Sequence, residues 1–230
     1  MKTANIVEKD TKKEPLPIQR VLKGLIITVA PTLALTIILA WIFYPERYYF
    51  FRDYVSRLGA YYSTNSLPNL TSSIIFTVGF SFCGFLFLII MIIYFIKREL
   101  AFNYMKGAFC LLMVAGGALT SIPQDHPTLR ILHGIGAALF IGGFGVLNFT
   151  LQMMRFTRRH RPKKFEKTKN FYWDLTITIF VFIALFIFAI FYSLKVITSS
   201  PVLQILAQSS QKFILIIDCI AIFFIDLDDM

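Results

Sequence analysis

The sequence predicts an all-α, polytopic membrane protein: a bundle of six transmembrane helices with both termini in the cytoplasm. Three observations support this fold class. Of the 230 residues, 57% are hydrophobic and only 16% are charged, well below the charged fraction of an ordinary soluble domain. Apolar stretches of about 18 residues or more recur along the chain. Lysines and arginines also alternate between dense and sparse connections, as cytoplasmic and external loops do.

Six stretches are long enough to cross a bilayer as helices. Two are weaker than the others, because Lys106 lies near the start of the third and the first half of the sixth is polar. We expect residues 25–227 to form the transmembrane domain and residues 1–24 to form a basic cytoplasmic tail. The predicted spans are residues 25–44, 72–96, 105–122, 131–154, 173–194 and 205–225.

The distribution of basic residues orients the bundle. The tail, the second loop and the fourth loop together hold 17 of the 23 lysines and arginines, so both termini are predicted to be cytoplasmic. The formal charge of +10 then requires no nucleic-acid partner. Much of it lies in the segment from Arg155 to Lys169, which suits an anionic leaflet, each cation contributing about 1 kcal/mol. Topology alone is the favoured explanation of this segment, and a specific role in binding anionic lipid or a partner is the alternative.

Small residues mark one face of the fourth predicted span. Gly134, Ala138 and Gly142 recur at every fourth position. Because apolar contact alone does not drive helices together in lipid, such stripes favour close van der Waals contact between helices. We expect Ala138 and Gly142 to face the third span at close range. A substrate or ion path along the glycines is the alternative.

The third loop carries the most distinctive polar residues. Pro127 suits the first position of the fourth helix, which makes His126 or Asp125 its cap. His133 then lies roughly 9 Å along the helix, in an apolar segment where an imidazole needs a polar partner. If both lie on one helix without a break at Pro127, His126 and His133 are too far apart to bind one metal ion as a one-turn histidine pair would. No histidine in another span could complete a haem site, so we expect neither a metal nor a cofactor.

Two motifs extend this interpretation. Before the second span, the pattern Ile-Ser-Asp-x-Gly-Ala is matched by Val55, Ser56, Leu58, Gly59 and Ala60, with Arg57 in place of the acid. The pattern Gly-x-Phe-Pro-x-Asp followed by His-x-x-Gly-Ala is matched by Pro123, Asp125, His133, Gly136 and Ala137, with Ser121 and Ile122 as departures. Gln211 and Lys212 also match a Gln-Arg pair at the start of the last span.

Over about residues 21–227 the chain therefore resembles a prokaryotic family of six-helix membrane proteins of unknown function. It also resembles the related eukaryotic DRAM/FRAG-type proteins, which include autophagy modulators and the N-terminal domain of a GPI-anchor lipid-remodelling protein. The resemblance implies a six-helix bundle associated with membrane lipids, without an established reaction. Such a protein would lie in the plasma membrane of a prokaryote or in an endomembrane of a eukaryote.

These residues predict a pocket on the non-cytoplasmic face that binds a lipid headgroup or another small anionic ligand. Arg57 and Lys212 would hold a phosphate, and His133 is expected to point into the bundle and approach Ser56, Asp125 or Lys212. The candidate ligand-binding residues are Ser56, Arg57, Asp125, His126, His133 and Lys212.

Three other functions fit the same residues. In a membrane-embedded lipid-remodelling enzyme, His133 would be the general acid or base and Asp125 would orient it or hold a metal. Only one histidine supports that chemistry, so a non-enzymatic protein is favoured. In a small-solute transporter, Lys212 and the intramembrane Asp218 would form part of the transport path. The simplest alternative is that His133 and Asp218 only join helices by hydrogen bonds.

Overall fold

The structure is a computed structural model that describes residues 17–160, 169–198 and 200–230. In these residues the fold is all-helical, and the only β-type pairing is an isolated bridge between Tyr62 and Pro68. Short 3-10 helices follow α1 (η1, Val55–Gly59) and α6 (η3, Ile222–Phe224; η4, Leu227–Asp229). The long helices are α1 (Pro17–Ile42), α2 (Leu70–Ile96), α3 (Asn103–Thr120), α4 (Arg130–Arg159), α5 (Lys169–Ile197) and α6 (Pro201–Ala221).

Five of these six helices, all except α3, are long and apolar enough to cross a membrane. Large apolar side chains also remain on the outside of the bundle, for example Phe180, Phe182 and Phe186 on α5. Such a surface suits lipid rather than water. The chain is therefore a multi-pass membrane protein. α3 has 18 residues, includes Asn103 and Lys106, and lies between α2 and α4.

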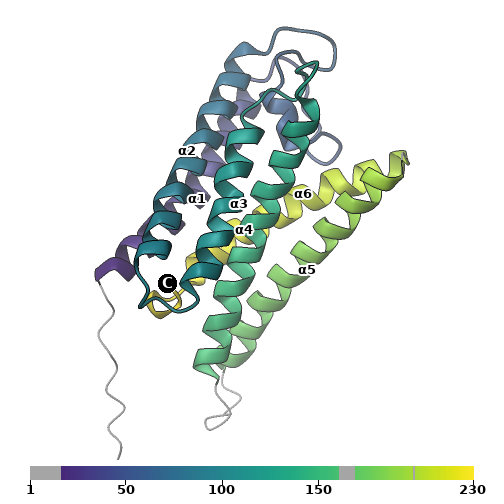
Figure 1. The fold of residues 1–230 in the computed structure, drawn as a ribbon. Coiled ribbons are helices and arrows are strands. Elements are labelled where there is room, and N and C mark those ends of the chain that lie inside the picture. The colour runs from purple at the N-terminus through teal and green to yellow at the C-terminus, as the bar shows by residue number, and fades with distance from the viewer. Residues whose placement is uncertain (1–16, 161–168, 199) are drawn as a thin grey trace, which may run out of the picture.

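The first four helices run side by side, whereas α5 and α6 lean away from the top of α4 and join at a distance from it (Figure 1). One end of the bundle holds the start of α1, the connection between α2 and α3, and the C-terminal end; we call it the termini end. The opposite end, here called the loop end, holds the connections 43–69 and 121–129. Hydrogen bonds from Tyr61 and Tyr62 to Asp125 join these two connections directly.

Close contact between α3 and α4 depends on glycines, as predicted, but on Gly116 of α3 and Gly136 of α4 rather than on Gly142. A Cβ atom on Gly116 would lie 2.4 Å from the backbone nitrogen of Phe140, and one on Gly136 would lie 2.5 Å from the Cβ of Leu119. The expectation for Gly142 is wrong, because a Cβ there would meet nothing within 4 Å. Gly143, one residue further on, contacts Met113, and successive helical residues point about 100° apart.

The ends of the helices differ from the sequence prediction where polar residues are helical. α1 begins at Pro17, so part of the predicted tail is helical, while residues 1–16 lie outside the described residues. α4 begins at Arg130, which contradicts the prediction that Pro127 is its first residue. At its other end α4 continues to Arg159, into the predicted basic loop, of which residues 161–168 lie outside the described part.

Candidate anion-binding site

The loop end is built around η1, which hydrogen bonds from α2 hold in place. Ser72 Oγ donates to the carbonyl oxygen of Leu58 at 2.8 Å, and Ser73 Oγ donates to that of Gly59 at 3.0 Å. A Cβ on Gly59 would lie 2.4 Å from the ring of Phe76, so only glycine lets η1 approach α2 this closely. Ser56 Oγ donates to Gln124 Oε1 at 3.2 Å and so ties η1 to the third loop.

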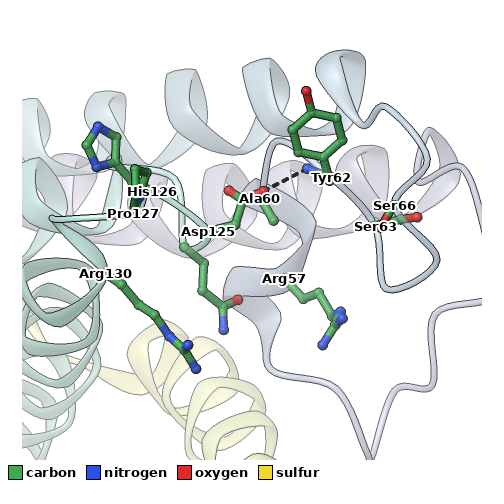
Figure 2. Close-up of a pocket in the computed structure, with 10 residues that line it drawn as sticks. Arg57, Ala60, Tyr62, Ser63, Ser66, Asp125, His126, Pro127 and Arg130 are labelled. Carbon is green, nitrogen blue, oxygen red and sulfur yellow. Dashed lines mark hydrogen bonds between the residues drawn. The ribbon is translucent and has the colours of Figure 1, made fainter.

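The side chains of Asp125 and His126 accept hydrogen bonds from backbone N–H groups at this end. The two carboxylate oxygens of Asp125 accept hydrogen bonds from the backbone N–H groups of Tyr61 and Tyr62, each at 2.8 Å. Figure 2 shows the bond from Tyr62. His126 Nδ1 accepts from the backbone N–H of Leu129 at 3.3 Å, just before α4 begins. His126 thus caps the turn that leads into the helix, in place of the helix N-terminus itself. Among the described residues, no hydrogen bond joins either side chain to His133, although the charge of Asp125 acts on its ring.

Two hollows flank the third loop. The outer hollow has a volume of about 480 Å³ and is lined by residues that include Ala60, Tyr62 and His126 (Figure 2). The inner cavity, of about 280 Å³, lies between α4, α5 and α6, beneath η1. Both are lined by Arg57, Gln124 and Arg130, which therefore form a common wall.

The inner cavity gathers positive charge. Arg57, Arg130 and Lys195 all line it, and no carboxylate among the described residues lies within the 4.0 Å of an ion pair to any of them. Lys195 and Arg130 are close enough to repel each other electrostatically. Like charges brought together without a counter-charge raise the free energy of the empty site. A bound anion would remove this penalty.

Neutral donors complete the lining. Gln204, Gln208 and Gln211 lie on one face of α6. Gln208 is only 5% exposed, yet its side chain makes no hydrogen bond with another described residue. Gln211 Oε1 accepts from the backbone N–H of Val55 at 3.0 Å. Burial, and to a smaller extent the nearby Tyr192, raises the pKa of Tyr54 to about 12, so its hydroxyl group keeps its proton and can donate.

His133 lies inside the bundle, 2% exposed, and lines the same cavity. Its Nδ1 is hydrogen-bonded to the carbonyl oxygen of Ile122. A carbonyl only accepts, so Nδ1 carries the proton and Nε2 is the acceptor of the neutral ring. Nε2 has no hydrogen-bond partner among the described residues. The structure therefore gives His133 a backbone partner, where the sequence indicated a side chain of Ser56, Asp125 or Lys212.

Lys212 and Asp218 do not belong to this cavity. Lys212 Nζ donates to the carbonyl oxygen of Asp53 and lies 5.9 Å from the ring centroids of Tyr48 and Phe50. It borders an apolar groove between α1 and α6. Because Lys212 is next to Gln211, it points about 100° away from the cavity. Asp218 is completely buried two turns further along α6.

Several lining residues were not predicted from the sequence. Arg130 and Lys195 were counted only as sparse positive charges of external loops, and Tyr192 was treated as part of an apolar span. The glutamines did carry a signal, since positions 204, 208 and 211 have the spacing of one helical face.

Among the described residues, no group of three or more His, Cys, Asp or Glu side chains could hold a metal ion. The donors of the inner cavity are cations, amides, hydroxyl groups and one imidazole, a set suited to anions. No protein-family model, no curated protein and no solved structure matches this chain.

Proposed function

We propose that this protein binds the phosphate-containing headgroup of an anionic membrane lipid in the inner cavity. The observation that carries the proposal is the grouping of Arg57, Arg130 and Lys195 around one cavity without a carboxylate among the described residues. Arginine binds phosphate through paired N–H groups and lysine through a point charge. Gln208 and the Tyr54 hydroxyl group add neutral donors.

The proposal includes a topology. We infer that all six helices span the membrane, that both termini are cytoplasmic, and that the loop end faces the other side. The 18 residues of α3 would reach about 27 Å, close to the hydrocarbon thickness of a bilayer. The inner cavity is close to the ends of α4 and α5 that lie at the loop end. It would then be at the depth of lipid headgroups.

A lipid-remodelling enzyme is the second candidate, and His133 is the observation that favours it. Its unpaired Nε2 belongs to a side chain that lines the same cavity as the three cations, where it could act as a general base. Asp125 would not orient it, since its carboxylate is held by Tyr61 and Tyr62. His133→Asn separates the two functions: binding alone survives this change, whereas turnover of a bound lipid does not.

Native mass spectrometry tests the binding. The protein is placed in nanodiscs of equal parts phosphatidylglycerol and phosphatidylcholine, then released, and the retained lipid is identified. Each of Arg130→Gln and Lys195→Gln should lower retention of phosphatidylglycerol about tenfold or more, since a charged hydrogen bond contributes roughly 1.5–3 kcal/mol.

Arg52→Gln is the matched control, because Arg52 is an exposed arginine at the same end that does not line the cavity. It should retain phosphatidylglycerol as the wild type does. Equal retention of both lipids by the wild type, or an equal loss in all three variants, would contradict the proposal.

A further inference from the structure

A second polar site lies deep in the bundle, apart from the inner cavity. Asp218 of α6 is fully buried, and its Oδ1 accepts a hydrogen bond of 2.9 Å from Asn148 Nδ2 of α4. Its other oxygen, Oδ2, has no hydrogen-bond partner among the described residues. Gly145 leaves room for Oδ2, since a Cβ there would lie 3.3 Å from it. If the only role of Asp218 were to join two helices, an amide side chain would do so at a lower free-energy cost, because it carries no charge to desolvate.

A chain of hydrogen bonds leads from Asp218 toward the termini end. Gln152 Nε2 donates to Asn148 Oδ1 at 3.5 Å, and Arg155 Nη1 donates to Gln152 Oε1 at 3.2 Å. These residues are spaced along α4 as one helical face. We call Asn148, Gln152 and Arg155 the polar ladder.

One donor of each ladder residue leads toward Asp218, while Gln152 Nε2 also donates to the carbonyl oxygen of Ala221 at 2.7 Å. The guanidinium group of Arg155 polarises the Gln152 amide, which in turn polarises Asn148, so the last donor presents a strengthened positive end to Oδ1. Arg155 is itself paired with Asp174 of α5, which also contacts Arg159 and His160. The ladder therefore connects a buried carboxylate with a cluster of charged side chains around Asp174 at the termini end.

We propose that Asp218 is a reversible proton-binding site whose ionised form is stabilised by the polar ladder. Oδ1 keeps its hydrogen bond in both states, and Oδ2 is the atom that takes up a proton from water and releases it. No described lysine, arginine or histidine forms an ion pair with Asp218. The thiol of Cys219 on α6 interacts electrostatically with Asp218, and the thiol of Cys83 on α2 interacts with Cys219.

Infrared spectroscopy of the protein in lipid tests this directly. A protonated carboxylic acid has a C=O stretching band that ionisation removes and that shifts in heavy water. The wild type should show such a band from Asp218 that is lost as the pH is raised, and Asp218→Asn should lack that band. Cys219→Ala should retain it.

The role of the ladder is tested by Gln152→Met, which keeps the shape of the side chain and removes its donor and acceptor. The midpoint of the band should move to higher pH by about one unit, because the ionised form loses its support. Asn148→Ser breaks the chain one step nearer and should act in the same direction.

Thr150→Val on α4 is the control, since Thr150 lies outside the ladder, and it should leave the midpoint unchanged. A carboxylic band that does not titrate, or that persists in Asp218→Asn, would overturn the proton site. A band that titrates identically in wild type, Gln152→Met and Asn148→Ser would overturn the part assigned to the ladder. Lipid retention is independent of both outcomes, because Asp218 does not line the inner cavity.

Discussion

Glu46 fastens the segment after α1 to the hairpin that precedes α2. Its carboxylate accepts hydrogen bonds of 2.6 Å from the backbone N–H of Thr64 and 2.6 Å from Asn65 Nδ2. Burial alone would raise the pKa of Glu46, but these bonds together outweigh it and hold the pKa below its ordinary value of 4.5. One carboxylate thus fixes the hairpin whose Ser63 and Ser66 border the outer hollow.

This predicts a pH dependence of stability. Since the folded-state pKa of Glu46 is depressed, its contribution is complete above the unfolded-state value and is lost as the pH falls through the folded value, below about pH 4.5. In detergent, Glu46→Gln should melt at a lower temperature than wild type at pH 7, and the difference should shrink below that pH. Glu99→Gln, at an exposed glutamate of the termini end, is the control. Melting curves of Glu46→Gln and wild type that coincide at pH 7 would show that the carboxylate contributes nothing.

At the scale of elements, α3 and α4 form a close pair of neighbouring helices. Gly116 and Gly136 let the two backbones meet, and the ring centroid of Phe140 on α4 lies 5.2 Å from that of Phe80 on α2. Lipid offers apolar contact to any helix, so this close fit is what makes the association of α2, α3 and α4 specific.

Replacing these glycines by alanine should therefore distinguish the effect of close helix contact on stability from the effect of helix propensity. Gly116→Ala and Gly136→Ala should each destabilise the protein by about 1–3 kcal/mol, because the new methyl group meets backbone atoms that cannot move aside. Gly142→Ala has open space and should be neutral or stabilising by up to about 1 kcal/mol. Unfolding in mixed micelles measures all three. Equal effects at the three positions would contradict this account of the interface.

For the whole molecule, the decisive prediction is its orientation. Thr64 is exposed at the loop end and Arg98 at the termini end, so Thr64→Cys and Arg98→Cys should react with a membrane-impermeant maleimide from opposite sides. Cys83 and Cys110 are buried and Cys219 is partly buried, so the wild-type protein should give little background. Labelling of both variants from the same side would refute the proposed topology.

The sequence was sufficient for the helices and insufficient for the polar contacts between them. Apolar runs locate helices because hydropathy is a local property. The side on which a polar residue lies depends on its neighbours in space: Gln211 faces the inner cavity while Lys212, next to it, contacts the backbone of Asp53. His133 was correctly expected to be buried, because an imidazole in an apolar segment needs a partner.

The polar ladder shows why the other polar contacts between helices could not be predicted from the sequence. Asn148, Gln152 and Arg155 have the spacing of one helical face, which the sequence displays. Counting Arg155 as the first residue of a solvated basic loop concealed this, because a buried arginine is plausible only once its partner is known. That partner, Asp174, lies on the next helix beyond the loop, and only the fold brings the two together.

The wall shared by the two hollows links them thermodynamically. Arg57 and Arg130 supply positive potential to both sides, so an anion in the outer hollow neutralises part of the field that a headgroup in the inner cavity would meet. Two anions would disfavour each other without touching, and the penalty must be the same whichever of them binds first. Soluble polyanions at the loop end would thus act as antagonists of the lipid, and the occupancy of the inner cavity would report on the ionic composition outside it.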